Sequence, residues 1–252
     1  MSQIIAVVNQ KGGVGKTTTA VNLTAALHEA GKRVLLCDFD PQANATSGFG
    51  VEKNKGFSIY DVLAERCTAK DAVVKTPYGD VIPSASALAG AAVELIAVEN
   101  REYVLKNALA PLKGDYDYIF IDCPPSLELL TLNALCAAES IFVPVQCEYY
   151  ALEGLADLMA TLRAVKMRLN PELYIFGVAL TMFDARLRLS YQVAEEVRKH
   201  FPGKVFAAMI PRNVRLSEAP SHGLPVLAYD KYSRGADAYR QLAKECILKE
   251  GL

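Results

Sequence analysis

The sequence predicts an α/β fold built on a mostly parallel, twisted sheet with helices on both faces. Short runs rich in apolar, β-branched residues alternate with helical patterns. Within each run, apolar residues stand at consecutive positions, so both faces of the strand are apolar. Strands of a parallel sheet look like this because helices cover both of its sides. Strands are expected at residues 4–8, 34–37, 118–121, 141–145, 174–180 and 205–210. Helices are expected at residues 16–29, 87–110, 128–138, 151–169, 190–200 and 235–248.

The composition favours one domain over residues 1–252. A hydrophobic content of 52% is enough for one sizeable core, and only residues 44–80 look irregular. The net charge of −1 means that any DNA binding must use a local patch. Six cysteines without a C-x-x-C pair favour reduced, buried thiols. The first strand has no basic leader before it and no apolar run is long enough to span a membrane, so we expect a cytoplasmic protein.

The strongest motif lies between the first expected strand and the first expected helix. There the sequence reads Lys-Gly-Gly-Val-Gly-Lys-Thr, and glycines let backbone N–H groups converge on a phosphate at a helix N-terminus. Lys16 is expected to contact the β- and γ-phosphates, and the Thr17 hydroxyl to bind Mg²⁺. The motif predicts a P-loop nucleotide site made of Lys11, Gly12, Gly13, Val14, Gly15, Lys16, Thr17 and Thr18.

This loop departs from the usual G-x-x-x-x-G-K-[ST] pattern, because Gln10 stands at the first glycine position. Lys11 lies five residues before Lys16. It is either a solvated loop lysine or a lysine that serves a nucleotide held by a facing subunit. Phosphoryl transfer depends on positive charge placed where negative charge develops. In the second case, hydrolysis would depend on dimerisation.

Aspartates follow two other expected strands, at the edge where ligands of parallel sheets bind. Asp122 closes an apolar run and is expected to place a carboxylate near Mg²⁺. Asp38 and Asp40 end the second strand, and their side chains share a direction if the strand persists that far. A turn or helix-cap role for either of these two aspartates is the alternative.

Five sequence blocks resemble the ParA/MinD family of deviant Walker A ATPases, and most of all its short chromosomal-type ParA (Soj) members. These blocks span nearly the whole chain and lie at residues 11–17, 38–42, 122–126, 144–154 and 210–220. The resemblance implies a single-domain P-loop NTPase that hydrolyses ATP with Mg²⁺. No arginine stands where an internal arginine finger would, so hydrolysis by one subunit alone is expected to be slow.

The resemblance also implies roles for individual residues. Lys11 matches the signature lysine that contacts nucleotide across a sandwich homodimer. Asp40 matches a residue implicated in orienting the attacking water, which leaves Asp38 as an indirect partner of Mg²⁺. Pro211 and Asn213 match positions that hold the adenine ring, and the amide of Asn213 offers both a donor and an acceptor to the base.

Basic residues gather late in the chain, where they form either solvated helix faces or a DNA-binding patch. The resemblance favours nonspecific double-stranded DNA bound by the ATP dimer, with Arg186 and Arg215 at the matching positions. It further implies association with the nucleoid and a ParB-type centromere-binding partner. Because the P-loop starts by residue 11, we expect no N-terminal helix-turn-helix extension.

Two other functions remain open from the sequence. A MinD-like membrane-associated ATPase would need a terminal amphipathic helix, and residues 239–252 carry an apolar stripe. The ordinary interpretation of that stripe is a helix packed on the domain, so we expect no membrane association. A metabolic relative, such as an iron–sulfur electron donor or an amide ligase, is the other alternative. A shared cluster would need exposed cysteines, whereas Cys123 and Cys136 are expected to be buried.

Overall fold

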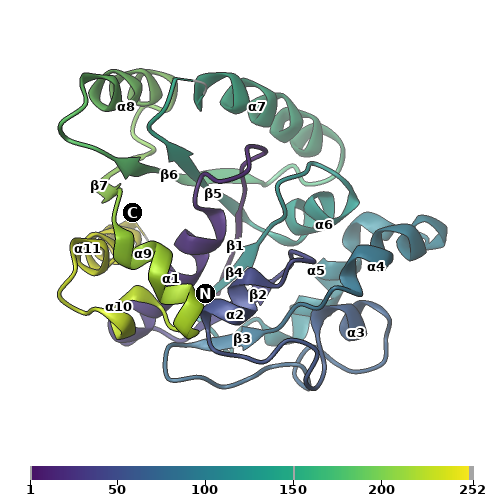
Figure 1. The fold of residues 1–252 in the computed structure, drawn as a ribbon. Helices are drawn as coiled ribbons and strands as arrows, with labels where there is room; N and C mark the ends of the chain where they lie inside the picture. Colours follow the sequence, from purple (N-terminus) through teal and green to yellow (C-terminus); the bar gives the residue numbers. More distant parts are fainter. Residues whose placement is uncertain (1, 150, 250–252) are drawn as a thin grey trace.

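A parallel sheet forms the middle layer of the computed structural model, which describes residues 2–149 and 151–249 (Figure 1). Its strands are β1 (Gln3–Val7), β2 (Val34–Asp38), β3 (Asp80–Ile82), β4 (Tyr118–Asp122), β5 (Ser140–Gln146), β6 (Tyr174–Phe183) and β7 (Val205–Pro211). They lie in the order β3-β2-β4-β1-β5-β6-β7, and every pairing between neighbours is parallel. The predicted fold class is confirmed.

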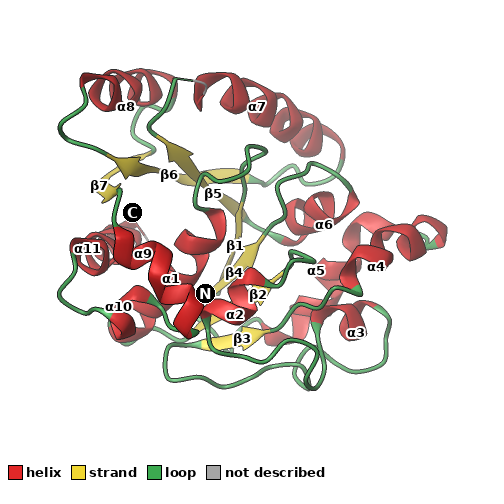
Figure 2. Ribbon diagram, in the orientation of Figure 1, coloured by secondary structure: helices red, strands yellow, loops and turns green. Residues whose placement is uncertain are grey.

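Helices cover both faces of this sheet (Figure 2). One face carries α1 (Lys16–Glu29), α2 (Asn44–Gly48), α9 (Val214–Glu218), η4 (Ala219–His222), α10 (Val226–Tyr229) and α11 (Arg234–Lys249). The other face carries α3 (Ile59–Leu63), α4 (Leu88–Glu94), α5 (Val104–Leu109), α6 (Leu129–Ala137), α7 (Ala151–Arg168) and α8 (Arg188–His200). Each layer of helices therefore encloses its own hydrophobic core against the sheet.

Strand β1 shows how the sequence divides its side chains between the two cores. Ile4 and Ala6 belong to the core under α3–α8, whereas Ile5 and Val7 belong to the core under α1 and α11. All four side chains are fully buried, because successive residues of a strand point to opposite faces. Each larger aliphatic side chain buried in this way contributes about 1.5–3 kcal/mol.

The expected helix over residues 87–110 is wrong as a single element. After α4 the chain forms the 3₁₀ turns η1 (Leu95–Ala97) and η2 (Arg101–Tyr103), then α5, then η3 (Ala110–Leu112). Val98 is extended and Asn100 takes a φ of 54°, a left-handed conformation that asparagine tolerates better than most residues. Ile96 stays 61% exposed, so little burial would favour a continuous helix here.

Strand β3 is not among the expected strands. It has three residues, lies at one edge of the sheet and pairs in parallel with β2. The preceding segment, expected to be irregular over residues 44–80, also contains the five-residue helices α2 and α3. Elements this short are stabilised by their partners in the fold rather than by their own pattern.

The last helix packs on the domain, as its ordinary interpretation requires. The apolar stripe of α11 buries Tyr239, Leu242, Ala243 and Cys246 in the core shared with α1 and β7. The Tyr239 hydroxyl lies 3.2 Å from the Thr19 hydroxyl of α1. Across the described ranges, no helix is long and apolar enough to cross a membrane.

Gly177 of β6 lies close to Phe206 of β7, so a substitution at Gly177 tests the packing of these two strands. A Cβ atom added at Gly177 would lie 2.2 Å from Cε2 of Phe206, a fully buried ring of the core. We expect Gly177→Ala to lower the free energy of unfolding by about 1–3 kcal/mol, measured by urea denaturation. Gly90→Ala in α4 is the matched control, because its nearest contact would be 3.7 Å away. Equal stability of the two variants would contradict the packing described here.

Candidate nucleotide-binding site

The P-loop connects β1 to α1 at the carboxyl edge of the sheet. Gly15 is the N-cap of α1 with a φ of 87°, and Gly13 has a φ of 77°. A Cβ at Gly13 would meet no atom within 4 Å, so backbone conformation rather than space favours glycine there. The first-turn N–H groups of the 14-residue α1 face the end of the loop and form an anion site.

Lys16 is held inside this loop by burial and by a hydrogen bond to the loop itself. Its side chain is only 7% exposed, and Nζ donates a hydrogen bond of 3.1 Å to the carbonyl oxygen of Lys11. Burial lowers the pKa of Lys16, while the nearby carboxylates of Asp122 and Asp40 act in the opposite direction. A largely desolvated ammonium group interacts strongly with a phosphate, because little water has to be removed from it.

Asp122, at the end of β4, is fully buried. Neither of its carboxylate oxygens makes a hydrogen bond of normal geometry within the described residues. Burial raises the pKa of Asp122 well above its usual value, and the charge of Asp38 raises it further. Thr17 lies close enough to lower that pKa but outside normal hydrogen-bond geometry. A buried carboxylate without partners is costly unless a cation lies beside it.

These features fit Mg²⁺. Magnesium typically takes one or two protein ligands and fills its other positions with substrate phosphates and water. Asp122 and the Thr17 hydroxyl, at the N-terminus of α1, would be the oxygen ligands from the protein. The described part of the chain holds no group of three or more His, Cys, Asp or Glu side chains suited to a metal.

Asp38 and Asp40 are both buried next to this site, at the end of β2. Asp38 accepts hydrogen bonds from the amide and the hydroxyl of Thr46, at 2.7 and 2.6 Å, which ties β2 to α2. Burial raises the pKa of Asp38 to about 6 despite these bonds. Asp40 accepts a hydrogen bond of 3.0 Å from the amide of Gln42. The turn role that the sequence left open for Asp40 is thus present, and its role toward water stays a prediction.

Lys11 lies at the rim of the loop. Its side chain pairs with Glu148, a residue that the sequence did not single out. Its Nζ is 3.6 Å from Oε2 of Glu148, and about a third of the side chain is exposed. Glu148 also accepts a hydrogen bond from Gln146 and lies 3.7 Å from the guanidinium of Arg212. The signal for Glu148 was its place directly after a strand, inside the block at 144–154. In this structure the extra lysine is therefore paired within its own chain.

A hollow of about 590 Å³ adjoins the P-loop and matches the expected base site. Its lining includes Gly15, Thr18, Thr181, Met182, Pro211 and Asn213. Asn213 caps α9, because its Oδ1 accepts a hydrogen bond of 2.8 Å from the amide of Arg215, which leaves the NH₂ group as a donor. Thr181 and Met182 were missed, although their place near the carboxyl end of β6 could have indicated them.

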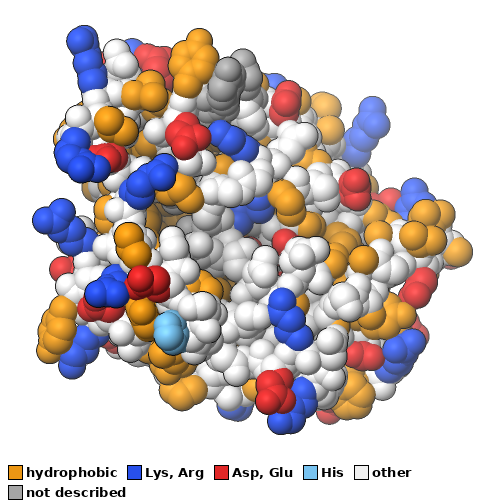
Figure 3. Space-filling model, in the orientation of Figure 1, with side chains coloured by type: hydrophobic (Ala, Val, Ile, Leu, Met, Phe, Trp, Pro, Cys, Tyr) orange, Lys and Arg blue, Asp and Glu red, His pale blue; other side chains and the backbone are white. Residues whose placement is uncertain are grey.

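The two predicted DNA contacts are exposed but already paired. Arg186 forms a forked ion pair with Asp184, at 2.7 and 3.0 Å. Arg215 lies 2.8 Å from Glu218 and 3.2 Å from Asp230. The hydrogen bonds from Arg186 lower the pKa of Asp184 to about 2. On the face shown in Figure 3, basic and acidic side chains are interspersed rather than gathered into one patch.

The cysteines are free thiols, and their burial was predicted. Cys123 and Cys136 are buried, while Cys67 is half-buried. Burial raises the pKa of Cys136 to about 11 and that of Cys123 well above its usual value, so both thiols are protonated and poor ligands. This environment does not suit an iron–sulfur cluster shared between subunits.

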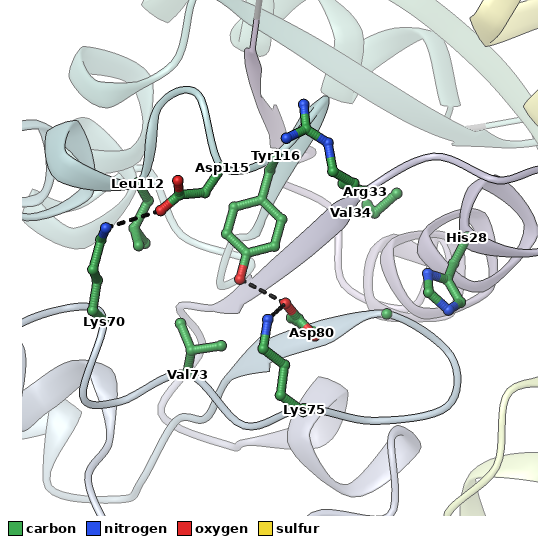
Figure 4. A pocket seen from close by; sticks show the side chains of 11 residues that line it. His28, Arg33, Val34, Lys70, Val73, Lys75, Asp80, Leu112, Asp115 and Tyr116 are labelled. Carbon is green, nitrogen blue, oxygen red and sulfur yellow. Dashed lines mark hydrogen bonds and ion pairs between the residues drawn. The ribbon is translucent and has the colours of Figure 1, made fainter.

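A second large hollow, of about 490 Å³, lies at the opposite edge of the sheet, near the amino ends of β2, β3 and β4 (Figure 4). Its lysines pair with carboxylates that also line it, and Arg33 pairs with Asp117 nearby. Lys70 lies 3.0 Å from Asp115, Lys75 pairs with Asp80, and the Tyr116 hydroxyl donates to Asp80 at 2.6 Å. This hollow therefore offers no free charge for a phosphate.

Comparisons with known proteins agree with the site. An AAA domain family model matches residues 2–175. The chain is 58% identical to the sporulation initiation inhibitor protein Soj of Bacillus subtilis strain 168, over 97% of this chain and 98% of that protein. The chain belongs to the Soj/ParA family of ATPases. It is also 52% identical to the chromosome partitioning protein ParA of Caulobacter vibrioides strain NA1000, over 98% of this chain and 95% of that protein.

The fold of this ATPase also matches a solved structure of cobyrinic acid a,c-diamide synthase from Mycobacterium smegmatis, with bound ATP analogue and magnesium. The TM-score is 0.87 at 39% identity, and the match covers 100% of this chain and 98% of that one. The family resemblance seen in the sequence is thus confirmed. The roles of individual residues remain predictions.

Variants of Asn213 separate two roles of this residue, the capping of α9 and the predicted recognition of the base. Asn213→Ser keeps an oxygen that can cap α9 but removes the NH₂ donor, whereas Asn213→Ala removes both. We expect both variants to bind ATPγS about tenfold more weakly, measured by calorimetry. Only the alanine variant should also lose about 1 kcal/mol of stability. Wild-type nucleotide affinity in Asn213→Ser would exclude the amide from base recognition.

Proposed function

We propose that this protein is a dimerising switch ATPase that drives chromosome or plasmid partitioning. The observation that carries the proposal is the different environment of the two lysines of the P-loop. Lys16 is buried and poised for the nucleotide of its own subunit, whereas Lys11 is partly exposed at the rim. The names of the relatives from B. subtilis and C. vibrioides support partitioning as the process.

Within one subunit, the site would bind ATP through the backbone of the P-loop and the ammonium of Lys16. Thr17 and Asp122 would hold Mg²⁺, which neutralises charge on the β- and γ-phosphates. Burial lowers the pKa of Lys16, and Asp40 is buried close enough for its charge to oppose that shift. From that position Asp40 would orient the attacking water, while Asp38 anchors the loop to α2.

Between subunits, Lys11 would leave Glu148 and contact the nucleotide of the partner. A partly exposed ion pair such as Lys11–Glu148 contributes only about 0–1 kcal/mol, because water screens it and both side chains lose freedom. A triphosphate carries more charge than one carboxylate and competes well for the lysine. Dimerisation would therefore depend on ATP and would complete the catalytic site.

A pair of variants tests whether Lys11 leaves Glu148 to contact the nucleotide of the partner subunit. We expect Lys11→Ala to bind ATP within a few-fold of wild type but to form no ATP dimer, measured by sedimentation velocity with ATPγS. Glu148→Gln removes the competing carboxylate, so its dimer should form at equal or lower protein concentration than the wild-type dimer. An intact ATP dimer in Lys11→Ala would refute the role of Lys11 across the interface.

The ATP dimer would bind nonspecific double-stranded DNA and so associate with the nucleoid in the cytoplasm. Arg186 and Arg215 are exposed, and DNA phosphates would take the place of the carboxylates that now pair with them. Two copies of a weak patch on one dimer gain affinity through avidity, which links DNA binding to nucleotide state. A ParB-type centromere-binding protein would stimulate hydrolysis and release the dimer from DNA.

Charge variants around Arg186 test the DNA surface. Arg186→Glu and Arg215→Glu should each weaken DNA binding at least about tenfold while the ATP dimer persists. Asp184→Asn frees Arg186 from its own carboxylate, so it should strengthen DNA binding. Binding is measured by mobility shift with ATPγS over a salt series. Lys106→Glu, at an exposed lysine of α5, is the control. Unchanged DNA retention in both arginine variants at moderate salt would refute the assignment.

The name of the M. smegmatis relative raises a second candidate function, ATP-dependent amidation. The more similar relatives, at 58% and 52% identity, favour partitioning. Turnover assays separate the two. A partitioning ATPase responds to DNA and a ParB-type protein, whereas an amide ligase responds to a carboxylic acid substrate and an amide donor.

A further inference from the structure

An apolar hollow of about 280 Å³ lies beside α7, at the amino ends of β5 and β6. Its walls include Met159 and Leu162 of α7, Leu173 before β6, and Ile141 and Ile175 of the two strands. This edge of the sheet is opposite to the one that carries the P-loop. The hollow therefore has no part in the nucleotide site.

Three cations stand at the edge of this hollow. Arg163 and Lys166 come from α7, and Lys204 precedes β7. All three are exposed, and none forms an ion pair with another described residue. No carboxylate of a described residue lines the hollow. In this it differs from the hollow in Figure 4, where lysines and aspartates neutralise one another.

Apolar walls beside cations that pair with no described residue favour an occupant that has both an apolar group and negative charge. A bulky apolar side chain of the occupant would displace water from the walls, and carboxylates beside that side chain would pair with the cations. Small-molecule sites typically measure about 300–1,000 Å³, so this hollow suits one large side chain better than a cofactor. DNA would use the cations but gain nothing from apolar walls. Insertion into a membrane needs several projecting apolar side chains. Leu162 and Leu173 are buried, and Tyr174 is the one lining residue among the exposed large apolar side chains of the described chain.

We propose that this hollow is a docking site for an acidic amphipathic segment of a partner protein. One bulky apolar side chain of that segment would enter between α7 and the strand ends. Aspartates or glutamates flanking it would contact Arg163, Lys166 and Lys204. Helices that bind in grooves use the same combination of apolar anchors and flanking charges.

Designed peptides test the proposal with the full-length protein. The probe is a fluorescein-labelled, 15-residue helical peptide with one central phenylalanine and glutamates on both sides of its apolar stripe. One matched peptide replaces phenylalanine by serine, and another replaces each glutamate by lysine. We expect saturable anisotropy changes with the first peptide and at least about tenfold weaker binding of the other two. Amide shifts in NMR spectra should centre on Leu173 and Ile175.

Charge-reversed variants locate the contact. Arg163→Glu and Lys166→Glu should each weaken binding of the acidic peptide about tenfold. Lys244→Glu, at an exposed lysine of α11 outside the hollow, should leave it within about twofold. Thermal unfolding verifies that all three variants fold.

Three results would overturn the proposal. The first is no saturable binding of the acidic peptide up to about 1 mM, the range of the weakest specific contacts. The second is equal binding of the serine peptide, which would make the apolar walls irrelevant. The third is peptide binding that survives charge reversal while retention of DNA, or of phosphatidylglycerol vesicles, is lost. That result would assign the cations to DNA or to a lipid surface instead.

Discussion

The burial of the parallel strands on both faces is the constraint on which the rest of the structure depends. Every residue of β2, β4 and β5 is buried, so these strands can carry charged groups only where they end. Asp38 and Asp122 end neighbouring strands at the same level, because β2 and β4 pair in register there. The P-loop follows β1, the next strand of the sheet. The charged site is thus a consequence of the sheet and needs no separate scaffold.

Much of the fold could be predicted because it depends on local pattern. Helix α1 begins and ends where the sequence predicts, since a glycine N-cap precedes it and its apolar residues recur at helical spacing. The breaks between α4 and η3 were not predicted, because left-handed Asn100 and the poor burial of Ile96 appear only in the fold. Strand β3 depends on its pairing with β2, which no local pattern encodes.

The residues of the candidate site likewise fall into those that a local motif predicts and those that only the fold brings together. Lys16, Asp122 and the loop glycines were predictable, because their chemistry lies in a contiguous motif next to a strand. Glu148 was missed because its importance depends on its closeness to Lys11, across two strands that are neighbours only in the folded sheet. Met182 likewise becomes part of the base site only because β6 ends beside the P-loop.

The charge balance at the site explains why nucleotide and metal should bind together. Lys16 is the buried lysine of the described residues, and the charges of Asp122 and Asp40 act on it. Asp38 adds a third buried carboxylate, whose charge acts on Asp122. Burial raises the pKa of Asp122 because its charge has too little compensation in the folded protein. A bare triphosphate would add negative charge to this deficit and meet repulsion from the same carboxylates. Its magnesium complex would bring a cation to the buried carboxylate of Asp122, so one binding event would satisfy both the aspartates and the phosphates.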